Sequence, residues 1–168
     1  MKKSLIFALC LVAGFSLIFV AGCGKKAAET AAEKAIEKST NGQADVDLST
    51  NSVKVNTNAG TFEVGGKIDL PSGFPSDVYV IDGTITAATT LTANEGYTIS
   101  IVTDKSVSEA KDLYEAKLKA DGWTITFTMN VADGASVAGE KDNRTVTVSI
   151  GKTEGQTQVV VGVANKSV

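Results

Sequence analysis

Histidine is absent from this sequence of 168 residues, and cysteine occurs only twice. Without histidine the chain cannot build a Ser-His-Asp or Cys-His catalytic arrangement, and it lacks the commonest zinc ligand. Proline is also scarce, since only Pro71 and Pro75 are present. From these absences we expect no enzyme of the histidine-dependent classes, no metal site and no cofactor.

The N-terminus carries the most specific motif of the chain. Two lysines precede the apolar run 5–20, and Ala21-Gly22 leads directly to Cys23. A basic start, an apolar stretch and small residues before the cut are typical of a secretory signal peptide. The alternative is an uncleaved signal anchor, because the run is nearly as long as the ~20 residues that span a bilayer.

This segment resembles the lipobox of bacterial lipoproteins. The resemblance implies that the thiol of Cys23 receives a diacylglyceryl group, that a peptidase cuts between Gly22 and Cys23, and that acyl chains such as palmitate anchor the mature protein. Several acyl chains hold a protein stably on a membrane, whereas one gives only reversible binding. We therefore expect a lipid-anchored protein on the extracytoplasmic face of a bacterial cell membrane or outer membrane. With Cys10 removed and Cys23 acylated, no disulfide is expected.

Charge and length limit the partners and the number of domains. The 16 basic and 19 acidic residues give a mildly acidic chain, which argues against nucleic acid as a partner. We expect a signal peptide over 1–22, a tether over 23–50 and a single α+β domain over 51–168. The tether is either a semi-rigid helix over 27–38, where helix-forming residues dominate, or a partly disordered spacer.

Most of the domain is predicted to be antiparallel sheet. Apolar and polar residues alternate in short stretches, as they do in half-buried strands. On this basis we expect short strands at 53–55, 62–64 and 68–70. A short apolar run indicates another at 78–81, and the turn signal Asn94-Glu95-Gly96 indicates a pair at 85–91 and 97–102. Pro71 and Pro75 interrupt the pattern, and Phe74 between them is expected to insert into the core.

One amphipathic helix is expected over about 106–121. Ser106 and Glu109 have the spacing of a capping box, and Gly122 is suited to end the helix as a C-cap. The apolar positions between them follow the helical period, so one face should be buried.

A four-strand meander is predicted after the helix. Its strands are expected at 123–129, 135–140, 144–150 and 156–163. In the first of these, Ile125, Phe127 and Met129 alternate with threonines, so we expect the bulky side chains to face the helix. Short strands, one helix and a meander place the domain in the α+β class.

Four stretches resemble a small domain of uncharacterised bacterial secreted and lipid-anchored proteins. They are 71–78, the helix face 114–118, Asp121-Gly122-Trp123 and 144–148. The resemblance covers roughly residues 68–163 and consists of core and turn residues. It implies a fold and no substrate, so no site residue is carried over from it.

The catalytic motifs that can be tested are incomplete. Ser108 and Lys111 have the Ser-x-x-Lys spacing of penicillin-binding proteins, but the partner motifs of that fold are missing. The aspartates at 45, 47, 69, 77 and 82 lack the spacing of a calcium-binding loop. We therefore predict no catalytic residue.

Threonine-rich strand faces are the remaining candidate for a ligand surface. Thr124, Thr126 and Thr128 share one predicted face, and Thr145 and Thr147 share another. Together they would present a flat surface of hydroxyl groups to a glycan or an extended peptide. The simpler interpretation is that threonine is an ordinary residue of half-exposed strands.

These observations favour a non-enzymatic interaction module that is held on the outer side of a membrane. An envelope protein or a glycan is the expected partner. Two alternatives stay open: an envelope hydrolase that uses carboxylates or the Ser108–Lys111 pair, and a structural subunit that pairs through a strand edge near 159–163.

Overall fold

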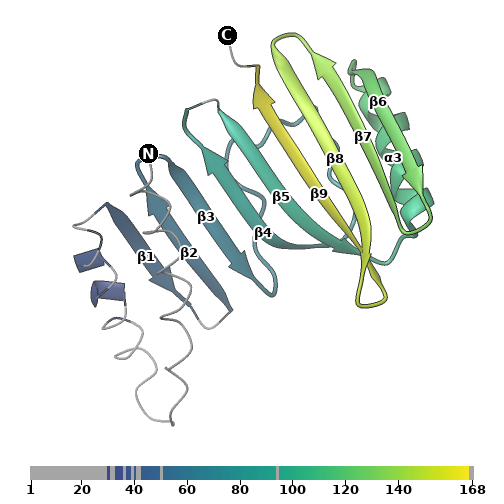
Figure 1. Ribbon diagram of the computed structural model, residues 1–168. Helices are drawn as coiled ribbons and strands as arrows, with labels where there is room; N and C mark the ends of the chain where they lie inside the picture. Colours follow the sequence, from purple (N-terminus) through teal and green to yellow (C-terminus); the bar gives the residue numbers. More distant parts are fainter. Residues whose placement is uncertain are drawn as a thin grey trace, which may run out of the picture.

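Nine strands and one long helix are found in the part of the chain that the computed structural model describes, residues 30, 33–35, 37, 38, 40, 43–49, 51–93 and 95–166 (Figure 1). The strands are β1 (Ala44–Leu48), β2 (Ser52–Thr57), β3 (Gly60–Gly65), β4 (Thr84–Leu91), β5 (Gly96–Thr103), β6 (Thr124–Val131), β7 (Gly134–Lys141), β8 (Arg144–Thr153) and β9 (Gln156–Asn165). The helix α3 (Val107–Ala120) stands between β5 and β6 in the chain.

All nine strands belong to one sheet, in the order β1-β2-β3-β4-β5-β9-β8-β7-β6, and every pair is antiparallel. This confirms the expectation of a mainly antiparallel, sheet-rich α+β fold with few helices. The predicted free edge near 159–163 is wrong, because β9 lies in the sheet between β5 and β8. The edges are β1 and β6.

Local sequence signals set both ends of α3. The Ser106 hydroxyl accepts a hydrogen bond from the Glu109 amide, and the Glu109 carboxylate accepts one from the Ser106 amide, which completes the capping box. At the other end Gly122 has a φ of +86°, and the Trp123 amide donates to the Leu118 carbonyl at 2.9 Å. This is the Schellman arrangement. Because Ser106 and Asp121 are the caps, the helix is one residue shorter at each end than the predicted span.

The core lies between α3, the loop 66–83 and one face of the sheet, which we call the inner face. Helix α3 contacts β6, β7 and β8, as Figure 1 shows at one end of the sheet. Fully buried side chains of this core include Tyr114, Leu118, Ile99, Ile101, Val148, Val159 and Val161. The opposite, outer face of the central strands carries small polar side chains such as Thr98, Ser100, Thr147 and Ser149, because neighbouring residues alternate between faces.

The loop 66–83 covers the sheet without forming strands, which corrects two predictions. Residues 68–70 and 78–81 have no strand structure. Ile68 and Ile81 are instead buried core residues of the loop, and the Ile81 amide donates a hydrogen bond to the Tyr114 hydroxyl at 3.3 Å. Phe74 is half-buried and packs against the core, as expected.

Strand β6 differs from its prediction because of a β-bulge between Ile125 and Phe127. An extra residue in one strand shifts the alternation by one, so the side chains after it change face. Phe127 lies opposite Ala138 and in line with Thr147, on the outer face, and its side chain is 52% exposed. The expectation that Phe127 and Met129 face the helix is therefore wrong, while Ile125 does pack against the core.

The sheet begins at Ala44, inside the stretch 23–50 that was expected to be tether. The described residues among 30–38 are helical, and the Glu33 carboxylate accepts a hydrogen bond from the Leu48 amide at 2.8 Å. This contact joins the segment to β1. None of the described helices is long and apolar enough to cross a membrane.

Candidate functional site

An open groove lies on the inner face of the sheet, where the covering layer ends. Its volume is about 1080 Å³, and it runs between the loop 69–75 and the strands β2 to β5, β8 and β9. Residues that line it and that bear on recognition are Asp69, Leu70, Gly73, Thr92, Tyr97 and Asn165. The loop meets the sheet at β4 and β5, where the Ile68 amide donates to the Ile85 carbonyl at 2.9 Å and Gly73 lies beside Tyr97.

The prolines and Gly73 give the groove its wall. Phe74 donates its amide hydrogen bond to the Pro71 carbonyl at 3.1 Å, which closes a turn. Gly73 has a φ of +83°, and a Cβ atom there would lie 2.8 Å from the Tyr97 hydroxyl oxygen. Glycine is therefore needed both for the backbone conformation and for the space beside Tyr97. The Phe74 ring meets the Tyr97 ring edge-on at 5.8 Å and fixes its position.

Two polar groups of the groove are available to a ligand. Neither the Tyr97 hydroxyl nor the Asp69 carboxylate forms a hydrogen bond with any residue that the structure describes. Leu70 beside them is 43% exposed, and it is a large apolar side chain on the groove wall. Other polar groups are already engaged, since Asn165 donates to the Glu95 carboxylate at 3.0 Å and Lys54 lies 3.8 Å from Glu63.

Arg144 also lines the groove, and its guanidinium is paired with Asp77, which Lys141 contacts as well. The guanidinium donates two hydrogen bonds to the Asp77 carboxylate, at 2.9 and 2.6 Å, and Lys141 donates a third at 2.7 Å. The Arg144 hydrogen bond is the largest cause of a pKa of Asp77 held far below its usual value. The lining of the groove holds three carboxylates, on Glu63, Asp69 and Glu95, and two cations, on Lys54 and Arg144, so it is acidic by one charge.

The Asp77 cluster, made of Asp77, Trp123, Lys141 and Arg144, was missed by the sequence reasoning. The Trp123 indole donates to the Asp77 carbonyl at 2.7 Å, and the Arg144 guanidinium lies over the Trp123 ring at 5.1 Å. Lys141 also donates to the Asp121 carbonyl at 2.7 Å, at the end of α3. Three of the stretches that carried the family resemblance, at 71–78, 121–123 and 144–148, meet here. The resemblance was the only signal that could have pointed to the cluster.

The candidate threonines do not form one surface. Thr124 and Thr145 both lie opposite Glu140 and hence share the outer face with Thr147. After the bulge the side chains of β6 change face. Thr128 therefore lies on the inner face, in line with the buried side chains of Val137 and Val148. Thr126 is the residue that the register skips.

In the Ser108–Lys111 pair, the lysine forms ion pairs with neighbouring carboxylates of the helix. The Lys111 ammonium lies 3.0 Å from the Glu115 carboxylate and 3.1 Å from that of Asp112. These contacts, with Glu115 first, raise the pKa of Lys111 above its usual value. A lysine that is held protonated is poorly suited to act as a general base for Ser108.

The remaining site predictions lie elsewhere in the chain. Gly22 and Cys23 lie outside the described residues. Among the described residues, no three His, Cys, Asp or Glu side chains come together in a group that could hold a metal ion. Of the five aspartates considered for calcium binding, Asp77 is hydrogen-bonded to Arg144 and Lys141, and Asp69 lines the groove.

Comparison with known proteins gives one similarity. A family model described as START domain-like matches residues 85–158, which is less than half of the 168-residue chain. The match runs from β4 through α3 to the start of β9, so it includes Tyr97 and Arg144 of the groove but not the wall around Leu70. No curated protein and no solved structure matches the chain. The chain is thus similar over residues 85–158 to the START domain-like family model.

Proposed function

We propose that this protein is a non-enzymatic binding module, anchored by lipid at Cys23 on the extracytoplasmic side of a bacterial membrane, and that its groove holds a glycan chain. The observation that carries the binding proposal is the groove of about 1080 Å³ with a free hydroxyl at Tyr97 and a free carboxylate at Asp69. Such a concave site with a few available polar groups is typical of ligand pockets.

A glycan suits the groove better than an extended peptide does. Peptides bind strands mainly through backbone hydrogen bonds at a free edge. The strands that form the groove floor, β2 to β5, β8 and β9, are each paired on both sides and offer no free edge. Recognition must therefore use side chains, and sugar hydroxyl groups can donate to Asp69 and can both donate to and accept from Tyr97.

The charge of the groove favours a neutral or basic ligand over an anionic one. Arg144 is paired with Asp77, and Lys54 lies near Glu63 with a side chain 44% exposed. Asp69 and Glu95 add negative charge at the rim. An uncharged sugar chain avoids repulsion from these carboxylates, whereas a phosphate-rich polymer would meet it.

Anchoring is proposed from the N-terminal sequence alone. The basic start, the apolar run 5–20 and the small residues before Cys23 match a lipobox. An anchor of several acyl chains would keep the groove close to the cell envelope, where glycan strands are abundant.

Binding of chitotetraose, an uncharged tetrasaccharide of N-acetylglucosamine, to the full chain in a mild detergent tests the proposal. Tyr97→Phe removes one hydroxyl, and we expect the Kd to rise roughly five-fold, as the loss of one hydrogen bond implies. Asp69→Asn removes a charged acceptor and should raise the Kd about ten-fold or more. The matched controls are Tyr79→Phe, which alters a tyrosine packed on Tyr114, and Asp133→Asn in the β6–β7 turn.

Equal affinity of the wild type, the two groove variants and the two controls for the tetrasaccharide would overturn the groove as the binding site. Hydrolysis of the sugar by the wild type, lost in Lys111→Ala, would instead establish the enzymatic alternative.

A further inference from the structure

The two edges of the sheet are built differently. Strand β1 has five residues, two of which are aspartates, and the Glu33 carboxylate accepts a hydrogen bond from the Leu48 amide on this strand. Short length, charge and a cap on a backbone group are the devices by which natural sheets protect their edges from other strands. The β1 edge is therefore closed to further pairing.

Strand β6 lacks these three protections, and its β-bulge, which is a further protective device, lies near its start between Ile125 and Phe127 and leaves Phe127–Val131 in regular register. Its eight residues, Thr124–Val131, include no charged residue and no proline. Alternate residues of an edge strand direct N–H and C=O groups away from its neighbour. Within the described chain only β7 pairs with β6, so those groups have no strand to bond. A long uncharged edge of this kind is a template for another strand.

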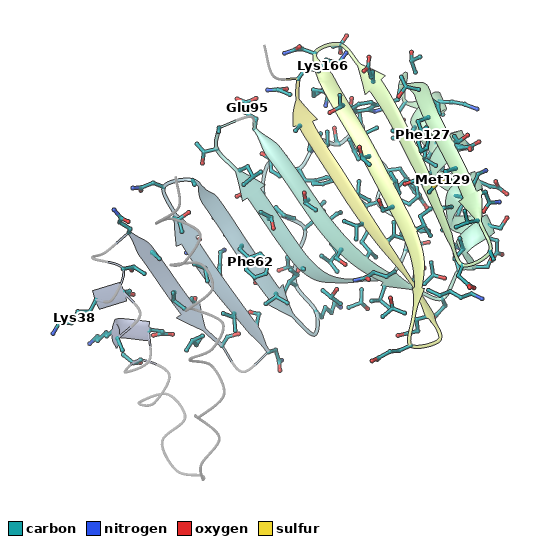
Figure 2. The ribbon with its side chains drawn as sticks, in the orientation of Figure 1. Lys38, Phe62, Glu95, Phe127, Met129 and Lys166 are labelled. Carbon is teal, nitrogen blue, oxygen red and sulfur yellow. The ribbon has the colours of Figure 1, made fainter. Side chains whose placement is uncertain are left out.

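The outer side of β6 is also apolar. Phe127, Met129 and Val131 are 52%, 46% and 56% exposed. All three follow the bulge, and their register partners Ala138, Ser136 and Gly134 are small. Figure 2 shows Phe127 and Met129 on β6 at the margin of the sheet. The bulge thus moves three large apolar side chains from the core to the surface along one edge.

We propose that β6 pairs antiparallel with β6 of a second copy of this chain, so that the sheet continues across a two-fold axis at Met129. The stretch Phe127–Val131 has a regular register, and centring the axis on Met129 keeps the pairing within it. Phe127 then lies opposite Val131 of the second copy, and the two Met129 side chains meet. Aromatic and β-branched residues paired across strands stabilise antiparallel sheets.

A second copy suits this edge because β6 is compatible with itself in charge. A strand without charge meets no like-charge repulsion when it pairs with its own copy. Asp133, in the turn that follows β6, and Lys152 on β8 are opposite in sign and lie 3.7 Å apart. The interface would be isologous, which is the commonest geometry of homodimers.

Sedimentation velocity of the full chain in a density-matched detergent tests this pairing. The wild type should form dimers, and Met129→Lys should weaken dimerisation at least about ten-fold, because two lysines would directly oppose each other. Met129→Asp should weaken dimerisation to a similar extent, because two aspartates would then oppose each other. An equal mixture of Met129→Lys and Met129→Asp should restore dimers, since opposite charges then face each other.

The mixture separates the proposal from simple unfolding, because damaged subunits would not recombine. Thr147→Lys is the control, since it adds the same charge to the exposed outer face of the central strand β8. A wild type that stays monomeric up to high concentration would overturn the proposal. So would dimers that survive Met129→Lys but are lost in Thr147→Lys, because that pattern indicates packing between sheet faces. Failure of the mixture to restore dimers would exclude the axis at Met129.

Discussion

Replacing Asp77 by asparagine should destabilise the fold markedly, although Asp77 stands in a loop. The carboxylate accepts two hydrogen bonds from Arg144 and one from Lys141, and the Asp77 and Arg144 side chains are only 26% and 25% exposed. Exposed ion pairs contribute about 0.2–1 kcal/mol, whereas removing one partner of a buried pair costs about 3–5 kcal/mol. For this intermediate burial we expect Asp77→Asn to lower the free energy of unfolding by about 2 kcal/mol, or Tm by roughly 8 °C.

The effect should depend on pH in a defined direction. The pKa of Asp77 is depressed in the folded state, mainly by the Arg144 hydrogen bond, while in the unfolded chain it is about 3.9. The contribution to stability is therefore complete above the unfolded value and declines as pH falls through about 4 toward the folded pKa. The difference between wild type and Asp77→Asn should shrink over that interval.

Urea unfolding followed by Trp123 fluorescence is the suitable assay, because the Trp123 ring lies beneath the Arg144 guanidinium. A double-mutant cycle with Arg144→Met should give a coupling energy of about 1–2 kcal/mol at pH 7. A coupling below about 0.5 kcal/mol, together with a mutational effect that does not change with pH, would refute the reasoning and assign Asp77 to the class of exposed pairs.

Four further substitutions have defined outcomes. Tyr114→Phe removes the acceptor of the buried Ile81 amide and should cost about 1–2 kcal/mol in urea unfolding; an unchanged midpoint would mean that the 3.3 Å hydrogen bond contributes nothing. Ser106→Ala removes the cap of α3 and should cost about 1 kcal/mol, whereas Ser108→Ala on the exposed first turn should cost little. Cys23→Ala should leave an unlipidated precursor, and an unchanged mass shift and detergent partitioning would contradict the lipobox interpretation.

Local signals were sufficient to predict α3 and most strands. The capping box at Ser106 and Glu109 and the Schellman ending at Gly122 involve residues a few positions apart, and hydrogen bonds of this range are encoded in short motifs. The turn signal between them likewise predicted β4 and β5 to within one residue at each end. These elements could be found because their causes are local.

Non-local features could not be found in this way. The register of β6 changes at the bulge after Ile125, yet Thr-Ile-Thr-Phe-Thr-Met alternates without interruption in the sequence, so no pattern marks the inversion. The central place of β9 depends on its pairing with β5, which is distant in the chain. Asp77 and Arg144 are separated by 67 positions, and a single aspartate in a loop carries no sign of its partner.

The groove was also beyond the sequence. Tyr97 was predicted as the first residue of a strand and Asp69 as the middle residue of the short strand 68–70, and neither was assigned to a site. They line the same groove only because the loop around Gly73 folds back over β4 and β5. The threonines were favoured instead, because residues of one type at alternate positions are visible in the sequence while a groove wall is not.

Chemical-shift mapping of the isotope-labelled full chain during titration with chitotetraose, an uncharged tetrasaccharide of N-acetylglucosamine, is the most direct test of glycan binding in the groove. The proposal predicts shifts that saturate and concentrate at the amides of Gly73, Thr92, Tyr97 and Asn165, which line the groove. Thr147 and Ser149 on the outer face should not move. The absence of saturable shifts, or shifts confined to the outer face, would contradict the proposal.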